Sequence, residues 1–214
     1  MKMWQGGIKM PDLDVESIGA IEIDALTEAG NIGAGHAATS LSKLLKENVM
    51  NRSTRSLLVT LDKVPEALGG ADRILAGVYA TFSGGLQGGI LMLFPEESVS
   101  TLLRVLGNCE LEDRRLTDFQ ESMLSEVGNI CLCWYLSAIS KMTGLELIPS
   151  VPACAYDMAG AVLDLALIQL GKVSDKALLI LTDFQGEINA IQGIFLMMLE
   201  PESQKSLAAK LGVG

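Results

Sequence analysis

The sequence has too few histidines and cysteines for the chemistry that clusters of those residues support. His36 is its only histidine, and its four cysteines are spread over 214 residues. Two of them, Cys131 and Cys133, are separated by one residue instead of two, and on a helix their side chains would point about 160° apart. We therefore expect reduced, buried thiols, and we expect the chain to bind no metal ion or other cofactor of its own.

Long hydrophobic runs and an excess of basic residues are also missing. Apolar segments such as Ala177–Leu181 and Gly193–Leu199 are far shorter than the roughly 18 to 20 residues that cross a bilayer. The N-terminus lacks the basic segment and continuous apolar stretch of a secretory signal. Sixteen Lys and Arg against 26 Asp and Glu give a net charge of −10, which repels a phosphate backbone. These absences predict a cytoplasmic protein that binds neither membrane nor nucleic acid.

Apolar residues, by contrast, are abundant. They make up 49% of the chain, which is enough to build a packed core. Only the first residues interrupt this pattern, because Gly6, Gly7 and Pro11 break any regular period. We therefore expect a tail at residues 1–16 and a single domain at residues 17–214.

The expected secondary structure of this domain runs through the same order twice. Each half begins with a long helix, continues with strands and ends with a short helix that opens at a proline. The first half is expected to contain a helix at Ser17–Glu47, strands at Arg52–Leu61 and Arg73–Phe94 with a hairpin turn at Ser83–Gly85, and a helix from Pro95 to Gly107. The second half is expected to contain a helix from a capping box at Thr117–Gln120 to Gly144, strands at Ala161–Leu170, Ala177–Leu181 and Gly193–Leu199, and a helix from Pro201 to Gly212. We place the two repeats at about 17–110 and 115–214.

The first helices of the two halves align in register. Glu28-Ala-Gly-Asn31-Ile32 matches Glu126-Val-Gly-Asn129-Ile130, and Ser42-Lys43 matches Ser140-Lys141, all with one offset of 98 residues. Two such copies inside matching helices are not expected by chance. We infer an internal duplication. It predicts an α+β domain with pseudo-two-fold symmetry, in which a central sheet carries the two long helices on its surface.

Each long helix presents a polar triplet on one face. Because a helical residue advances about 100°, positions spaced by four and then three residues share a narrow face. A polar helix face is usually only the solvated side, but Asn is a poor helix former, and its recurrence suggests that its amide is used. Small residues around the first triplet, Ala29 to Gly35, are expected to leave it clear for a partner. The triplets are Asp24, Glu28 and Asn31 in the first copy, and Ser122, Glu126 and Asn129 in the second.

These positions resemble the signature of the CheC family of chemotaxis phosphatases and its relatives CheX and FliY. The signature is Asp or Ser, then Glu four residues later, Asn three residues after that, and Pro another 23 residues on. The second copy matches at every position, with the proline at Pro152, whereas the first copy has Thr54 in its place.

The resemblance implies an enzyme that binds the phosphorylated response regulator CheY and hydrolyses its aspartyl phosphate. Asn31 and Asn129 would orient the attacking water, and Glu28 and Glu126 would pair with a lysine of the partner, whose own site would hold Mg²⁺. The remaining signature residues, Asp24, Ser122 and Pro152, would support docking and local shape.

Two other functions remain open on the sequence alone. One is a non-catalytic binding module for CheY-phosphate or for a CheD-type deamidase, an alternative that Thr54 favours for the first copy. Resemblance to FliY also suggests a scaffold of the flagellar switch. The internal duplication favours a monomer, because one chain supplies both halves.

Overall fold

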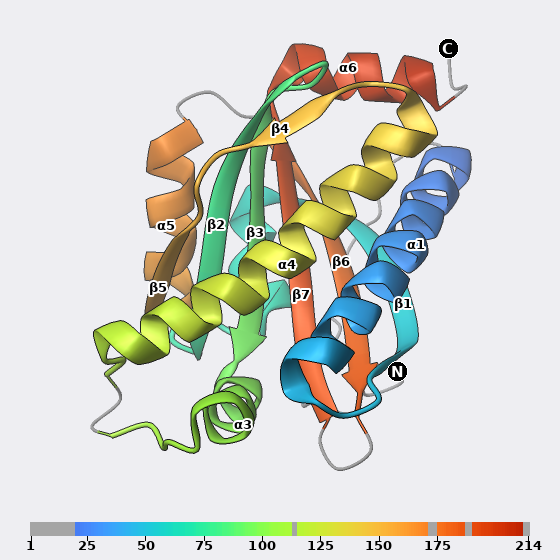
Figure 1. Cartoon of the computed structure of the whole chain (residues 1–214). Coiled ribbons are helices and arrows are strands. Elements are labelled where there is room, and N and C mark those ends of the chain that lie inside the picture. The colour runs from blue at the N-terminus through green and yellow to red at the C-terminus, as the bar shows by residue number, and fades with distance from the viewer. Residues whose placement is uncertain (1–19, 113–114, 171–174, 187–189, 212–214) are drawn as a thin grey trace.

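The computed structural model describes residues 20–112, 115–170, 175–186 and 190–211, and in them the chain folds around one seven-stranded antiparallel sheet (Figure 1). The predicted tail at residues 1–16 lies outside these ranges. The first half contains α1 (Ala20–Leu45), β1 (Met50–Thr60), η1 (Leu61–Lys63), α2 (Val64–Ala67), β2 (Ile74–Gly84), β3 (Gly88–Pro95) and α3 (Glu96–Gly107). The second half contains α4 (Asp118–Thr143), β4 (Leu147–Pro149), β5 (Ala153–Met158), α5 (Ala159–Leu170), β6 (Lys176–Gln185), β7 (Ala190–Leu199) and α6 (Pro201–Lys210).

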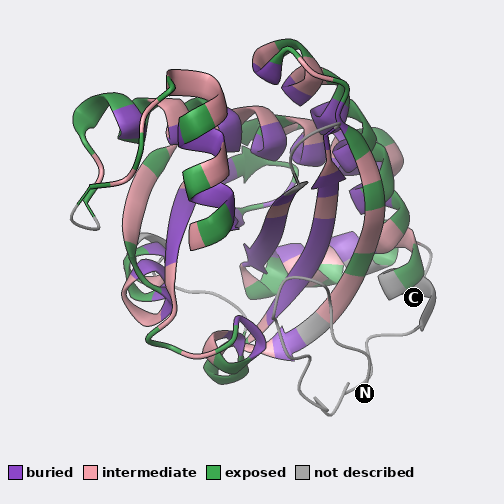
Figure 2. Ribbon diagram, turned by 90° about the horizontal axis from the view of Figure 1, so that it is seen from below, coloured by how far each residue is buried: buried purple, intermediate pink, exposed green. Residues whose placement is uncertain are grey.

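Helices cover both faces of the sheet, so its central strands are buried on both sides (Figure 2). Alternate residues of each strand enter two separate cores, as the period of two in a strand requires. On one face Ile90 and Met92 of β3 pack with α1, α3 and α4, while on the other Leu91 and Leu93 pack with α2 and α5. Every residue of β3 is buried. Double burial explains why β3 contains no polar side chain.

The strand order reads the same when the two halves are exchanged. The sheet runs β1, β6, β7, β3, β2, and then β4 and β5, which both pair with β2. If each strand is replaced by its counterpart in the other half, the same order is read from the opposite edge. The counterparts are β1 with β4 and β5, β6 with β2, and β7 with β3. Such an arrangement is what a two-fold relation between the halves produces. A common origin of the halves remains a prediction.

The limits of α4 follow the local signals in the sequence. The Oγ1 of Thr117 accepts the backbone N–H of Gln120 at 3.3 Å, and the Gln120 side chain accepts the Thr117 N–H at 3.0 Å, which completes the predicted capping box. At the other end Gly144 has a φ of 69°, a left-handed conformation that suits glycine. These contacts confirm the predicted limits of the second long helix.

One expected strand is wrong, because Ala161–Leu170 lies within the helix α5. The helical period is present: Ala159, Val162, Leu163 and Ala166 are buried, at spacings of three, four and seven residues. The helical period is not evident in the sequence, because apolar residues also lie on the exposed side of α5, where Ile168 is 75% exposed. An apolar run of this length suits either a buried strand or a helix.

The halves also differ where the signature proline falls. Pro152 lies between β4 and β5, outside both strands, where its lack of a backbone N–H costs no ladder hydrogen bond. At the matching position Thr54 lies inside strand β1, just after a register shift between Asn51 and Ser53, and is opposite Thr182 of β6. No helix in the described ranges is long and apolar enough to cross a membrane.

Candidate functional site

The two signature helices, α1 and α4, lie side by side on one face of the sheet and run in opposite directions (Figure 1). They touch closely at Gly33, where a Cβ atom would lie 2.9 Å from the Cα of Tyr135. One turn farther along, the ring of His36 stacks on that of Trp134, with centroids 4.8 Å apart and an interplanar angle of 20°. His36 and Trp134 are themselves separated by the repeat offset of 98 residues, so a two-fold axis relating the two halves would pass between these rings.

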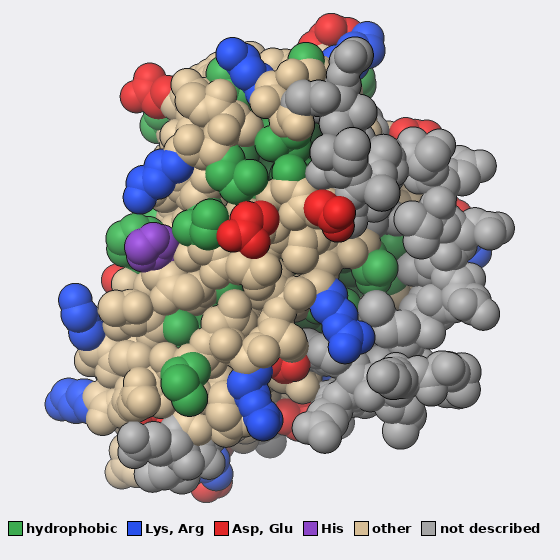
Figure 3. Space-filling view, turned by 90° about the vertical axis from the view of Figure 1, so that its right-hand side faces the viewer, with side chains coloured by type: hydrophobic (Ala, Val, Ile, Leu, Met, Phe, Trp, Pro, Cys, Tyr) green, Lys and Arg blue, Asp and Glu red, His purple; other side chains and the backbone are tan. Residues whose placement is uncertain are grey.

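The first polar triplet is exposed on α1. Asp24, Glu28 and Asn31 all face outward, as their spacing predicts. Beside Asn31, the side chain of Ile32 is 38% exposed. On the side of the molecule that carries α1, acidic side chains lie next to hydrophobic ones (Figure 3).

The small residues around this triplet have a different role from the one we expected. Ala29, Gly30, Gly33 and Ala34 are buried, and only Gly35 of the group opens onto free space. A Cβ at Gly30 would lie 3.0 Å from Thr54 Cγ2 and 3.2 Å from Ile180 Cγ2. These residues therefore let α1 approach the sheet and α4, and they do not clear space for a partner. The same holds for the matching Gly128 of α4, where a Cβ would lie 2.4 Å from the Cβ of Val78.

The second triplet lies on the outer face of α4. Ser122 and Glu126 are exposed, and Asn129 is half-buried. One turn after Asn129, Cys133 donates its thiol hydrogen to Asn129 Oδ1, with sulfur and oxygen 3.4 Å apart. Cys133 is exposed, which corrects the expectation that the thiols are buried; Cys131, which faces the core, fulfils it. Partial burial, and secondarily the negative charge of Glu126, raise the pKa of the Cys133 thiol.

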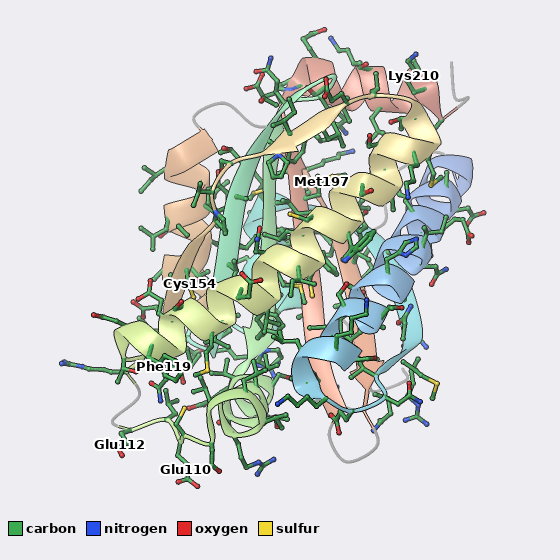
Figure 4. All side chains as sticks on the ribbon, viewed as in Figure 1. Glu110, Glu112, Phe119, Cys154, Met197 and Lys210 are labelled. Atoms are coloured by element: carbon green, nitrogen blue, oxygen red, sulfur yellow. The ribbon has the colours of Figure 1, made fainter. Side chains whose placement is uncertain are left out.

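The outer face of α4 extends beyond the signature residues. Phe119 lies in the first turn of α4, is 63% exposed and sits near the connector that carries Glu110 and Glu112 (Figure 4). Phe119, Ser122, Glu126, Asn129 and Cys133 follow one another at alternating spacings of three and four residues, which places them on one side of the helix. We call these five residues the α4 stripe. Sequence reasoning missed its two ends, although that alternating spacing was available to find them.

The two Glu–Asn pairs form separate centres. Asn31 lies two residues before Gly33 on α1, and Asn129 lies six residues before Tyr135, the residue of α4 that Gly33 contacts. In antiparallel helices with a rise of 1.5 Å per residue, this places the two amides roughly 12 Å apart along the helices. Groups that act on one reacting atom must approach within about 3.5 Å of it. Each helix therefore offers its own Glu and Asn. No cluster of three or more potential metal ligands occurs among the described residues.

Comparison with known proteins places these helices in a family. The model of the CheC-like family matches residues 21–51 and 119–156, which contain all the signature positions named above apart from Thr54. The CheY-P phosphatase CheC of Bacillus subtilis is 31% identical to the chain over 196 residues, which cover 89% of this chain and 94% of that protein. The chain belongs to the CheC-like family.

Solved structures share the fold. FliY of Thermotoga maritima superposes with a TM-score of 0.68 and 18% identity, covering 91% of this chain and 97% of that one. The middle domain of FliM from H. pylori gives a TM-score of 0.62 and 12% identity, covering 90% of this chain and 99% of that one. At such identities the likeness concerns the arrangement of helices and sheet alone.

Proposed function

We propose that this chain is a phosphatase that hydrolyses the aspartyl phosphate of a phosphorylated CheY-type response regulator. The observation that carries the proposal is the outward presentation of one Glu and one Asn on each of two surface helices, inside the segments matched by the family model. Support also comes from the relative of Bacillus subtilis, which is a CheY-P phosphatase by name and is similar over most of both chains.

The chemistry asked of the chain is modest. In hydrolysis of an acyl phosphate, water attacks phosphorus in line with the departing carboxylate, and the partner's Mg²⁺ and lysine stabilise the phosphoryl oxygens. What remains is to hold the water in place. A carboxamide can do this without titrating, because its oxygen accepts a hydrogen bond and its nitrogen donates two. We assign that role to Asn31 and Asn129.

The glutamates anchor the complex in this proposal. Glu28 and Glu126 are exposed, and among the described residues neither forms an ion pair within the chain. Their carboxylates are therefore available to a cation of the partner. An ion pair that forms one turn before each Asn would fix the position of the amide relative to the phosphate. Asp24 and Ser122 would lie at the edge of the same contact.

Decay of phosphorylated CheY, followed with and without the chain, tests the proposal. The wild type is expected to accelerate phosphate loss. Asn31→Ala and Asn129→Ala should each remove the contribution of one helix, and the double variant should lose acceleration on the order of 10²-fold, as for a misplaced reactant. Asn48→Ala, at an exposed site outside the helices, is the matched control and should behave as wild type.

Binding measured in parallel separates the two main alternatives. The double Asn variant should still bind phosphorylated CheY, whereas Glu28→Lys with Glu126→Lys should not, because each new cation would face the partner's lysine. A wild-type chain that binds CheY-phosphate yet leaves its decay unchanged would replace the phosphatase by a binding module. Normal binding by the Lys variants would show that Glu28 and Glu126 do not anchor the partner.

A further inference from the structure

We propose that Cys133 is a positioning residue that orients the carboxamide of Asn129, and that the first site lacks this device because Gly35 occupies the matching position. The inference rests on the proposed function and deepens it, since it concerns how the second amide is prepared for the attacking water. The contact that carries it is the hydrogen bond from Cys133 Sγ to Asn129 Oδ1, at 3.4 Å.

The hydrogen bond from Cys133 determines which way the oxygen and the nitrogen of the Asn129 carboxamide point. The oxygen and nitrogen of a carboxamide are similar in size, so an exposed Asn can adopt two orientations related by a half-turn. A thiol donates a hydrogen bond but is only a weak acceptor, so it favours the amide oxygen over the amide nitrogen. With Oδ1 held toward Cys133, Nδ2 points away from the sulfur, and Oδ1 keeps its second lone pair for another donor.

The thiol is suited to this role because it retains its hydrogen. Partial burial of the sulfur, and secondarily the negative charge of Glu126, raise the pKa of the Cys133 thiol and so favour the protonated form. The same surroundings argue against a nucleophilic cysteine, which needs a lowered pKa. Cys133 therefore acts through Asn129 and forms no bond to phosphorus.

The first site provides an internal comparison. Position 35 is the counterpart of position 133, and a Cβ there would meet no atom within 4 Å. Asn31 is exposed, whereas Asn129 is half-buried. The first amide thus has no donor one turn after it to choose its orientation, and part of its ordering must take place when the partner binds. An amide that is already oriented holds the water in the reactive geometry, which favours turnover without adding a contact to the partner.

Single-site chains test the inference. In an Asn31→Ala background, which leaves only the second site, Cys133→Ala should lower kcat roughly twofold to tenfold, the range of one neutral hydrogen bond, and leave KM unchanged. Cys133→Ser keeps a donor at this position and should restore most of the rate. In an Asn129→Ala background, Gly35→Cys should raise the kcat of the first site.

The outcomes are distinct from those of the proposed function. An Asn31→Ala chain without any phosphatase activity would remove the function assigned to the second site, and this inference with it. An active Asn31→Ala chain whose kcat is insensitive to Cys133→Ala would overturn the inference alone. Equal losses in the Ala and Ser variants would likewise overturn it, because they would report shape instead of hydrogen bonding, and so would a first site that Gly35→Cys leaves unchanged.

Discussion

Gly128→Ala should destabilise the protein even though alanine is the better helix former. Gly128 lies between Glu126 and Asn129 on the inner side of α4, and a Cβ there would lie 2.4 Å from the Cβ of Val78 and 2.6 Å from both of its methyl carbons. Overpacking of this kind costs about 1–3 kcal/mol, and the gain in helix propensity returns about 1 kcal/mol. Because all three contacts are far below van der Waals distance, we expect the cost to fall in the upper part of its range. The net loss should be roughly 1–2 kcal/mol.

Thermal unfolding provides the measurement. For a chain of this size the loss corresponds to a Tm lower by roughly 2–8 °C. Gly35→Ala is the matched control, since a Cβ there meets nothing within 4 Å, and it should raise Tm by roughly 2–4 °C. In a Val78→Ala background, which lacks the two methyl carbons, Gly128→Ala should cost less. A Gly128→Ala protein at least as stable as wild type would show that α4 does not lie on β2 as closely as described.

Three further outcomes are expected. Thr117→Ala removes the hydroxyl that accepts the Gln120 N–H and should cost about 1 kcal/mol in urea unfolding, whereas Thr117→Ser should cost little. Burial raises the pKa of the Asp183 carboxyl above 3.8, although the Ser53 hydroxyl and then Arg52 and Arg55 oppose the rise. The contribution of this group to stability is therefore present below pH 3.8 and is lost as pH rises through the folded-state pKa. The stability of Asp183→Asn relative to wild type should therefore increase from acidic to neutral pH. An equal difference in stability at acidic and at neutral pH would contradict this. Phe119→Ala should weaken binding of phosphorylated CheY at the second site with little change in Tm, because the ring is 63% exposed, and unchanged binding would exclude Phe119 from the contact.

The elements that sequence predicts well are those whose pattern is set locally. The capping box, the left-handed Gly144 and the polar triplets each depend on neighbours within one or two turns, and all lie where expected. The helix α5 was mistaken for a strand because an apolar run on both sides of a helix erases the contrast on which periodicity depends.

Contacts between segments that are distant in the chain are not evident from the sequence. Gly30 and Gly33 are small because Thr54, Ile180 and Tyr135 approach them, and none of these partners is a neighbour in sequence. Helical spacing places Gly30 and Gly33 on the buried side of α1 with Leu26, but it does not identify which distant residues come so close to them. Cys133 differs from these glycines, because it lies one turn after Asn129 and the helical period alone places it on the same outer face.

Two further differences between the halves lie near the axis that would relate them and beside the second site. Where α1 and α4 pack together, the Trp134 Nε1–H donates to Ser40 Oγ at 2.8 Å. The counterparts of Trp134 and Ser40 are His36 and Ala138, and because alanine has no side-chain acceptor, the equivalent bond from His36 to Ala138 does not form. Beside Asn129 stands Cys133, where the first half has Gly35.

Two identical subunits would have to make every such contact twice, because a two-fold interface is self-complementary. A single chain with two similar halves is free of that constraint. Each half can then change without its counterpart, and the changes seen here give one amide a hydrogen-bond donor that the other lacks. The phosphatase proposed for this chain should therefore draw most of its turnover from α4, with α1 contributing chiefly to partner binding. A first site whose kcat equals that of the second, measured in the two single-Asn chains, would contradict this division.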